Sequence, residues 1–341
     1  MTFLISPRGS LALPPRDRAV SNVLLIVNPG SRGGRRAQHV VGNALRDAGI
    51  TFEAAETSGP QHATSLVRER VSANPGAFDL VLALGGDGTA MEVASGLAQL
   101  EDAPPLGIVA AGTANILARS LGIPTNAGRA IAALLDADVA SIDIGRVTGG
   151  PAFAIGLGIG LDASMIAGTS TRLKRRIGYG AYALSALRAG LRLERFHVRI
   201  TVDGKVYEAE TSSVLVANFG TVLGGVLCFG AEIGHQDGVL DVCLYSPRSY
   251  VEAVRIFWRM LSGGVDRDCR VQIIRGRHVR VETDPPRPMQ ADGELLGLTP
   301  VDIRVEPNAV RVLVPRAAPH RWRAPRHAAV RTTPELLESS T

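Results

Sequence analysis

The residues best suited to chemistry are the run Gly85–Gly86–Asp87–Gly88–Thr89, which follows an apolar stretch and precedes a helical pattern. Glycines in such a turn let backbone N–H groups approach a phosphate, and the start of the following helix favours negative charge. Asp87 is a carboxylate in a place built for anions, and a bound Mg²⁺ would let it hold nucleotide phosphates that it would otherwise repel. The alternative is an Asp–Gly turn without a ligand, which the strand–loop–helix context disfavours.

Two more glycine-rich turns of the same kind lie in the first half of the chain. One is Asn28–Pro29–Gly30–Ser31–Arg32–Gly33–Gly34, and the other is Ala111–Gly112–Thr113–Ala114–Asn115. The first lacks the lysine and the spacing of a Walker A loop, and it does not match GxGxxG either. Each turn nevertheless follows a predicted strand and opens a helix, so all three should meet at one edge of a parallel sheet. Together they predict a phosphate site.

The segments around these turns alternate between strand and helix patterns from Asn22 to about Ile142. The expected strands are Val23–Val27, Phe52–Glu56, Leu80–Leu84 and Gly107–Ala110, and the expected helices are Gly34–Ala48, His62–Val71 and a third that ends at Leu97. The capping-box spacing of Thr89 and Glu92 predicts where this third helix begins. Such alternation predicts an α/β domain over residues 22–141, with a parallel sheet and ligands bound beyond the carboxyl ends of its strands.

The pattern changes after residue 142, where apolar residues recur with a period of two. The expected strands are His197–Val202, Val206–Ala209, Ser213–Ala217, Leu240–Tyr245, Val279–Glu282, Val301–Val305 and Val310–Val314. Turns such as Asp203–Gly204, Asp237–Gly238 and Asp292–Gly293 link them, and two helical patches interrupt them, at about 178–193 and 251–261. This pattern predicts an antiparallel, β-rich second domain over residues 142–315, whose last strand is able to return to the first domain.

Both ends of the chain are rich in Pro, Arg and Ser, and residues 1–21 and 316–341 are expected to be disordered arms. The C-terminal arm is basic around Trp322, and Arg172, Lys174, Arg175 and Arg176 form a second basic cluster before the helical pattern that ends at residue 193. Contact with an anionic membrane and simple solvation are both open for these two segments.

Composition narrows the compartment and the partners. The net charge of +5 and the pI near 9.5 favour an anionic partner, such as a nucleotide, nucleic acid or an acidic lipid headgroup. Aromatic residues make up 4%, which argues against a stacking platform for single-stranded nucleic acid. Three scattered cysteines indicate a reducing compartment and no disulfide framework. Without an apolar run of bilayer length or a secretory signal, we expect a cytoplasmic protein that meets membrane lipid only from the surface.

The order of these motifs resembles the diacylglycerol kinase catalytic domain, which is shared with sphingosine and ceramide kinases. The resemblance covers about residues 22–315. Its markers are Asn28–Ser31, Thr57 before Gly59 and His62–Ala63, Gly85–Thr89, Gly112–Asn115 with Ala118–Arg119, Leu121–Pro124, Ile142–Gly145, Gly158–Ala163, Asp237–Asp241 and Asp292–Glu294. It implies a second domain that is a β-sandwich, which closes a cleft over a Rossmann-like nucleotide-binding domain and admits a lipid.

The resemblance also implies roles for individual residues. The ATP contacts would be Asn28, Pro29, Gly30, Ser31, Arg32, Gly33, Thr57, Gly85, Gly86, Asp87, Gly88, Thr89, Gly112, Thr113 and Asn115. Glu294 matches the family's proposed general base, which takes the proton from the lipid hydroxyl. Asp237, with the carbonyls of Gly234 and Val239, matches a Mg²⁺ site described as structural in bacterial relatives. These assignments predict an ATP- and Mg²⁺-dependent lipid kinase.

The sequence departs from the family pattern at three positions. Arg32 stands where many members have glycine, Met91 where asparagine is usual, and Gln236 where an acidic residue often precedes Asp237. The last departure puts the second metal site in doubt. The lipid acceptor and the oligomeric state stay open, and exposed edges of the second domain could pair two copies.

Two other functions compete with the lipid kinase. NAD kinases and phosphofructokinases share Gly-Gly-Asp-Gly, but the Gly-Ser-Thr-Ala-Tyr-like segment and the Asn-Glu pair of an NAD kinase do not occur here. A non-catalytic nucleotide or lipid sensor is the alternative of another class. The presence of both Asp87 and Glu294 argues against a sensor, and a nucleic-acid-binding role rests on charge alone.

Overall fold

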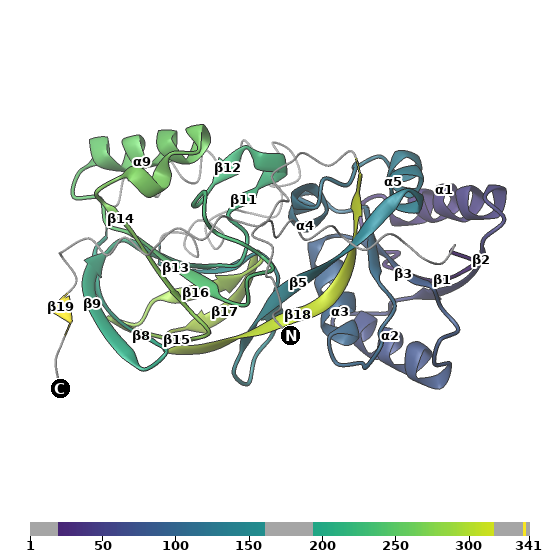
Figure 1. Cartoon of the computed structure of the whole chain (residues 1–341), viewed down its shortest axis with the longest axis horizontal. Helices are drawn as coiled ribbons and strands as arrows, with labels where there is room; N and C mark the ends of the chain where they lie inside the picture. Colours follow the sequence, from purple (N-terminus) through teal and green to yellow (C-terminus); the bar gives the residue numbers. More distant parts are fainter. Residues whose placement is uncertain (1–19, 161–193, 317–336, 339–341) are drawn as a thin grey trace, which may run out of the picture.

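The computed structural model describes residues 20–160, 194–316 and 337–338. The expected terminal arms, the basic cluster around Lys174 and the helical patch that ends at residue 193 therefore lie wholly or almost wholly outside the described residues. Two domains lie side by side, with the α/β domain on the right in Figure 1 and the β-rich domain on the left. Among the described residues, no helix is both long enough and apolar enough to cross a bilayer.

Four parallel strands form the sheet of the first domain, as the alternating pattern predicts. They are β1 (Asn22–Val27), β2 (Thr51–Glu56), β3 (Leu80–Gly85) and β4 (Leu106–Ala110), in the order β2-β1-β3-β4. The apolar residues of β1 and β3 are buried without exception, as expected for parallel strands that are covered on both faces. Because the chain winds outward in opposite directions from β1 and β3, the crevice beyond their carboxyl ends is the topological switch point, where ligands bind in such sheets.

Five helices cover this sheet. They are α1 (Gly34–Asp47), α2 (His62–Ala73), α3 (Asp87–Leu97), α4 (Ile116–Ser120) and α5 (Ala127–Leu135). The capping-box prediction for α3 is wrong, because the helix begins two residues before Thr89, with Gly86 as its N-cap. Glu92 instead accepts a hydrogen bond of 3.0 Å from the backbone N–H of Ala63, at the start of α2. The Glu92 carboxylate, which local spacing assigned to the cap of α3, therefore bonds to a residue of another helix.

The second domain contains two packed antiparallel sheets, so the predicted sandwich is confirmed. Its strands are β5 (Ala137–Val147), β6 (Ala152–Phe153), β7 (Gly156–Gly160), β8 (Phe196–Val202), β9 (Lys205–Thr211), β10 (Ser213–Ala217), β11 (Thr221–Val222), β12 (Leu227–Cys228), β13 (Leu240–Tyr245), β14 (Val271–Gly276), β15 (His278–Asp284), β16 (Pro288–Ala291), β17 (Glu294–Leu298), β18 (Val301–Pro315) and β19 (Leu337–Glu338). One sheet has the order β14-β13-β10-β7-β16-β17, and β9, β8, β15 and β18 lie in the other. Side chains such as Phe153, Leu157, Val198 and Ile200 form the core between the sheets.

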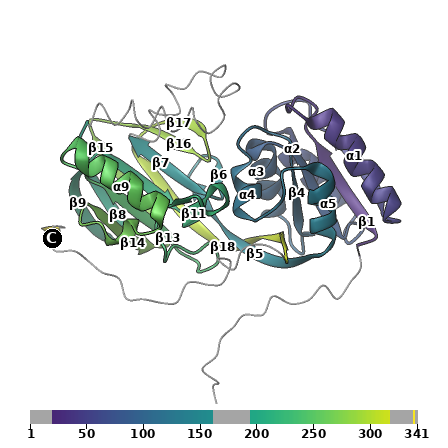
Figure 2. The same ribbon diagram turned by 90° about the horizontal axis from the view of Figure 1, so that it is seen from above.

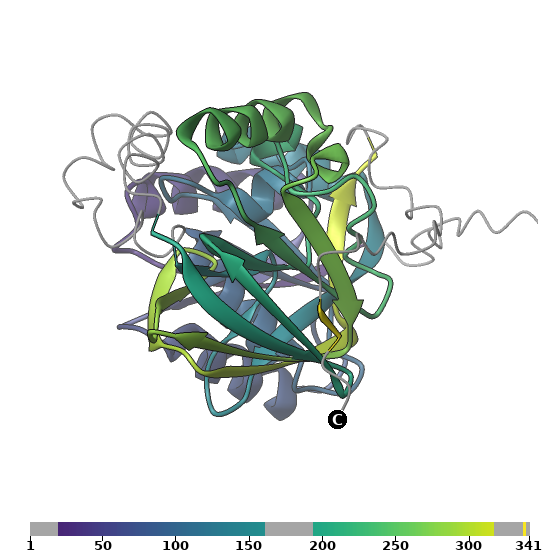
Figure 3. The same ribbon diagram turned by 90° about the vertical axis from the view of Figure 1, so that its left-hand side faces the viewer.

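A helix, α9 (Tyr250–Ser262), lies across the outer face of the six-stranded sheet, at the top of Figures 1 and 3. Short 3₁₀ turns stand at Leu223–Gly225 and Val265–Arg267. Ile256 of α9 and Val265 pack onto Leu215 and Cys243 of the sheet and form a small third core.

Two long strands join the domains. The expected pair Val301–Val305 and Val310–Val314 is one strand, β18, which pairs with β15 at one end and with β4 at Val312 near the other. It also pairs with β5 along most of its length, with a register shift between Glu306 and Val310. Since β5 runs through residues 141 and 142, the two domains share a two-stranded connection, which Figures 1 and 2 show between them.

Candidate active site

The three glycine-rich turns converge at the switch point of the first sheet, as predicted. The N–H of Asn28 donates to the carbonyl of Leu84 at 2.9 Å, which ties the first turn to the end of β3. The N–H of Ala111 donates to Gly85 O at 2.7 Å, and the N–H of Gly33 donates to Ala111 O at 3.3 Å. Backbone hydrogen bonds therefore link all three turns to one another.

Glycine is required where the second and third turns meet. A Cβ atom on Gly112 would lie 2.6 Å from the Cα of Gly86, closer than real Cβ contacts allow. Asn115 holds this turn in shape, because its Oδ1 accepts from the N–H of Gly112 at 2.9 Å and its Nδ2 donates to the Gly112 carbonyl at 3.0 Å. Asn115 itself has a φ of 48°, a left-handed conformation that asparagine tolerates better than most residues.

Asn28 connects the first turn to helix α3. Its Nδ2 donates to Oγ1 of Thr89 at 3.0 Å, while its Oδ1 accepts from the N–H of Gly30 at 3.0 Å. The hydroxyl of Ser31 donates to the Asn28 carbonyl at 2.8 Å. These contacts give Asn28 and Thr89 structural roles in shaping the turns. Thr57 lies on the adjacent strand end, where its N–H donates to Val27 O at 2.8 Å.

Positive charge gathers at the start of α1. Both α1 and α3 have a glycine N-cap with no capping side chain, and α1 has no acidic residue in its first turn. Arg32, Arg35 and Arg36 are exposed there, although cations at a helix N-terminus are unfavourable by a few tenths of a kcal/mol or more each. An anion bound at this end would reverse that penalty. Of these three residues, only Arg32 was named from the sequence. Arg35 and Arg36 could have been found from their positions in the first turn of the predicted helix.

Asp87 is turned toward the backbone at the start of α4. Its Oδ1 accepts from the N–H of Leu117 at 3.1 Å. Desolvation raises the pKa of Asp87, and the backbone N–H groups of Leu117, Ile116 and Asn115 oppose that rise. Asp87 therefore links the second and third turns.

The β16–β17 hairpin of the second domain reaches this same place. Glu294, at the start of β17, lies so close to α3 that a Cβ atom on Gly88 would be 2.9 Å from its Oε1. The charge of Asp87 also acts on Asp292, the first residue of the hairpin turn. The structure thus brings Glu294 to Asp87 and Gly88, although Glu294 follows Gly88 by 206 residues in the chain.

Asp292 is a site residue whose role sequence reasoning missed. Its Oδ2 accepts from the N–H of Ala154 at 2.7 Å, and its Oδ1 accepts from Ile155 and Gly156 at 3.0 Å each. Desolvation raises the pKa of Asp292 to about 6 despite these three hydrogen bonds. Asp292 fixes the hairpin against the segment before β7 and thereby positions Glu294.

Asp237, for which a structural Mg²⁺ was predicted, lies in a second acidic cluster. Nη2 of Arg275 is 3.4 Å from Oδ2 of Asp237, and its Nε donates to Oδ1 of the buried Asp241 at 2.6 Å. Desolvation raises the pKa of Asp241 to about 6, and its Oδ2 is buried without a hydrogen-bond partner. An arginine thus already supplies positive charge to the carboxylate that the Mg²⁺ would use. The role predicted for Asp237, Gly234 and Val239 remains an expectation from the resemblance.

The strand that begins at Glu294 also carries two exposed apolar side chains. Leu295 and Leu298 of β17 have exposed fractions of 54% and 60%, among the larger apolar exposures of the described residues. Exposed apolar side chains on the strand that carries this carboxylate are suited to a ligand that has both a polar head and an apolar part.

Comparisons with known proteins agree with this arrangement. A family model for the diacylglycerol kinase catalytic domain matches residues 22–147, and one for the YegS C-terminal NAD kinase beta sandwich-like domain matches residues 156–314. A Staphylococcus aureus (strain JH9) protein, provisionally named a lipid kinase, is 28% identical over 242 residues, which are 69% of this chain and 77% of that protein. An uncharacterised protein of Synechocystis is 27% identical over 78% of this chain, and the match spans 63% of its length.

The same fold has been seen in a solved structure. The crystal structure of a diacylglycerol kinase from Bacillus anthracis superposes with a TM-score of 0.72 and 28% sequence identity. The match covers 88% of this chain and 99% of that chain, so it includes both domains.

Proposed function

This chain belongs to the family of diacylglycerol kinase catalytic domains, and we propose that it transfers the γ-phosphoryl group of ATP to the hydroxyl of a lipid. The observation that carries the proposal is the meeting of three glycine-rich turns with Glu294 across the junction between the domains. A kinase needs these two parts, a cradle for the phosphates and a base for the acceptor, within one site.

The nucleotide side of the proposal rests on the turns and on α1. Glycine at positions 30, 86 and 112 would let a triphosphate approach the backbone of these turns closely. The N–H groups of Gly30 and Gly112 already donate to the side chains of Asn28 and Asn115, which hold the turns open. The exposed arginines at the start of α1 add positive charge where the phosphates would lie. Asn28, Thr89 and Asn115 keep the turns in place.

The acidic groups of the site fit a divalent cation that arrives with the nucleotide. Asp87, Asp292 and Glu294 form no ion pair with any cationic side chain in the part of the chain that the structure describes. Over the same residues, no three potential ligands gather into a complete protein-held metal site. Mg²⁺ is characteristically held by one or two carboxylates together with substrate phosphates, and it would neutralise the charge on those phosphates. Asp87 is the carboxylate we assign to it.

Glu294 would accept the proton of the lipid hydroxyl. Its carboxylate lies beside Gly88, at the start of the helix that follows the phosphate-binding turn. Leu295 and Leu298 would contact the apolar part of the acceptor and orient its hydroxyl toward the site. General-base catalysis by a positioned carboxylate contributes about a hundredfold or more to the rate.

Phosphate transfer from radiolabelled ATP to a panel of lipids, including diacylglycerol, a sphingoid base and ceramide, tests the proposal. We expect one lipid class to be labelled by the wild type and Glu294→Gln to lower kcat about a hundredfold or more with an unchanged KM for ATP. Asp87→Asn should be at least as damaging, since it weakens both the metal site and the link to α4. Glu210→Gln, which changes an exposed glutamate of β9, is the matched control and should retain full activity.

Two outcomes would overturn the proposal. Labelling of NAD with no lipid labelled would assign the site to the rival small-molecule kinase. Near-normal turnover of Asp87→Asn at saturating Mg-ATP would remove the role assigned to that carboxylate.

A further inference from the structure

Helix α9 exposes a stripe of large apolar side chains on its outer face. The exposed fractions are 75% for Val251 and 64% for Trp258, and they lie between 38% and 39% for the other four, Tyr250, Val254, Phe257 and Leu261. These six positions follow one another at i, i+1, i+4, i+7, i+8 and i+11, so they share one side of the helix. Single exposed apolar residues are common on protein surfaces, but six on one helical face form a contiguous patch that indicates a binding surface.

This stripe is not the face that holds α9 to the protein. Ile256 is buried against the six-stranded sheet together with Val265, and Met260 packs beside them. The helix therefore has two apolar faces, one turned inward and one turned outward. Packing within the domain accounts for the inward face, but it does not account for the apolar side chains of the outward face.

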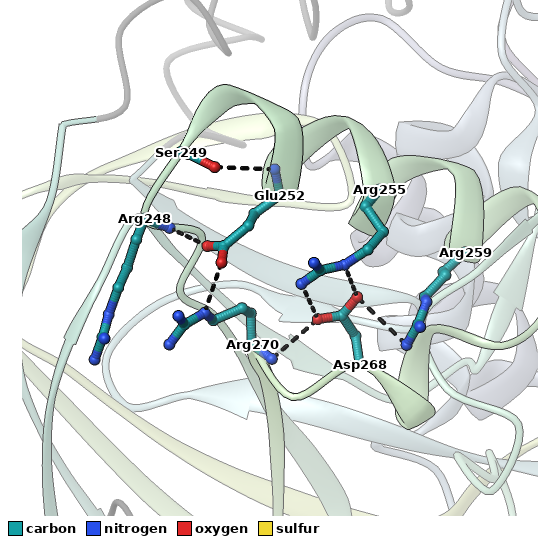
Figure 4. A network of polar contacts seen from close by, with 7 residues as sticks. All are labelled: Arg248, Ser249, Glu252, Arg255, Arg259, Asp268 and Arg270. Atoms are coloured by element: carbon teal, nitrogen blue, oxygen red, sulfur yellow. Dashed lines mark hydrogen bonds and ion pairs between the residues drawn. The ribbon is translucent and has the colours of Figure 1, made fainter.

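A polar network along the side of α9 fixes its orientation, as Figure 4 shows. The guanidinium of Arg255 donates two hydrogen bonds to the buried Asp268, at 2.9 and 3.0 Å, and Arg259 lies 3.4 Å from the same carboxylate. At the other end of the network, Glu252 accepts from Nε of Arg270 at 3.2 Å. These contacts attach α9 to the segment 268–270 with its apolar stripe outward, and its arginines lie on the flank of that stripe.

The flank of the stripe is positively charged. Residues 248–270 contain five arginines and three carboxylates, a net charge of +2. Arg255 and Arg259 share one carboxylate, and the exposed side chains of Arg248 and Arg267 form no ion pair among the described residues. Excess positive charge beside an apolar stripe is complementary to a surface that is apolar inside and anionic outside.

We propose that the outer face of α9 docks onto the surface of an anionic lipid bilayer. Amphipathic helices of this composition lie in the plane of the membrane interface, with aliphatic and aromatic side chains among the acyl chains and arginines at the headgroups. Trp258 and Tyr250 are residues that favour this interface. The choice of lipid over a protein partner rests in part on the proposed function, because a kinase for a lipid acceptor must reach that acceptor in a membrane.

A second copy of the chain fits this surface less well. Two-fold pairing through the stripe would set the same arginine-rich flank against itself, and like charges brought together in this way are destabilising. An anionic bilayer offers the opposite charge along the whole flank.

Sedimentation with vesicles, measured without ATP, tests this inference. We expect the wild type to bind vesicles that contain phosphatidylglycerol and phosphatidylcholine, with binding that rises with the anionic fraction and falls with salt. The double variant Val251→Ser/Trp258→Ser should lose about tenfold or more of this affinity. Val40→Ser, which removes a 40%-exposed apolar side chain from α1 in the other domain, is the matched control and should bind like the wild type.

Tryptophan fluorescence gives a second, direct measurement. The chain has two tryptophans, so in a Trp322→Phe background the emission reports on Trp258 alone. We expect a blue shift on adding vesicles and quenching by brominated acyl chains. Unshifted, unquenched emission in protein that sediments with vesicles would place the docking surface elsewhere. A change of oligomeric state in the double variant, with vesicle binding intact, would make the stripe an interface between copies.

Activity on a short-chain, water-soluble acceptor separates this inference from the proposed function. The double variant should retain wild-type turnover on that acceptor and lose it only on vesicle-borne lipid. If no lipid is phosphorylated but the α9 variant loses vesicle binding, the proposed function fails and the docking surface stands. If vesicle binding is unchanged in an active enzyme, the docking surface fails alone.

Discussion

Glu294 and Gly88 come from different domains, yet a Cβ atom at position 88 would lie 2.9 Å from Oε1 of Glu294. Gly88 is the second residue of α3, and Glu294 begins β17. The missing side chain at position 88 therefore lets the Glu294 carboxylate lie against the glycine-rich turn at the start of α3. A substitution of Gly88 therefore tests whether the close approach of the two domains matters for activity.

We expect Gly88→Ala to lower turnover without weakening the fold. The atom in the way is the end of a flexible side chain, so the Glu294 carboxylate would move aside, and alanine is more favourable than glycine in a helix by up to about 1 kcal/mol. Misplacing a general base should cost about tenfold or more in kcat. Turnover and thermal unfolding of the same variant measure both effects.

The control for this variant is Gly128→Ala, since Gly128 is the second residue of α5 and a Cβ atom there would meet only ordinary contacts at 3.5 Å or more. It should share the gain in stability and keep full turnover. Unchanged turnover in Gly88→Ala would show that Glu294 acts from another position or not at all.

The sheet of the first domain and its three turns could be predicted because their signals are local. A parallel strand that is buried on both faces has a short apolar run as its sequence pattern. The carboxyl ends of such strands lie at the same edge of the sheet, independently of the second domain. The same reasoning failed for Thr89 and Glu92, because their side chains bond to Asn28 and to Ala63 and not to their own helix. Local spacing does not reveal such distant partners.

Much of the second domain and half of the site depend on contacts that no local pattern encodes. The sequence of β7 is Gly-Leu-Gly-Ile-Gly, and because glycine is uncommon inside strands, this pattern did not predict a buried strand. Asp292 bonds to N–H groups 136 to 138 residues away, so its role follows only from the packing of β7 beside β16. Glu294 was identified through family resemblance, since an exposed carboxylate after an Asp–Gly turn has no distinguishing feature of its own.

Gly112→Ala should weaken nucleotide binding by displacing one turn from another. The new Cβ would meet the Cα of Gly86 at 2.6 Å, and backbone cannot move aside as a side chain can. We expect the affinity for Mg-ATP, measured by calorimetry, to fall about tenfold or more. Gly264→Ala, at a position where nothing lies within 4 Å of the added atom, should bind Mg-ATP normally. Equal affinities in the two variants would mean that the turns do not hold the nucleotide.

Asp292→Asn should change how stability depends on pH. Desolvation raises the pKa of Asp292 to about 6 from an ordinary value of 3.8, so between these values the folded protein binds more protons than the unfolded chain. The free energy of unfolding contributed by this group therefore falls as the pH rises from about 4 to about 6. Asparagine does not titrate, so the advantage of the wild type over the variant should shrink over this range, on the order of 2 kcal/mol.

Denaturant unfolding of both proteins at several pH values between 4.5 and 6.5 measures this difference. The comparison must be made between proteins, because desolvation lowers the pKa of His235 to about 4 and its contribution changes in the opposite direction over the same range. His235 is present in both proteins, so its contribution cancels in the difference between their free energies of unfolding. An advantage that grew with pH would mean that the three N–H groups favour the charged carboxylate over its burial.

Arg275→Gln should destabilise the protein, because the carboxylates of Asp237 and Asp241 lose their positive partner. Removing the guanidinium leaves Asp241, which has 1% of its side chain exposed, beside Asp237 with no positive partner, and loss of one member of a buried ion pair costs on the order of 3 kcal/mol. We expect a lower melting temperature than in Arg277→Gln, which changes an exposed arginine two residues along the chain. Millimolar Mg²⁺ without nucleotide should restore part of the loss in Arg275→Gln and leave the melting temperature of the wild type unchanged, because in the wild type Arg275 already supplies positive charge to Asp237 and Asp241. If Mg²⁺ instead stabilised the wild type and Asp237→Asn abolished that effect, a metal would share the cluster with Arg275, as the family resemblance implies for Asp237, Gly234 and Val239.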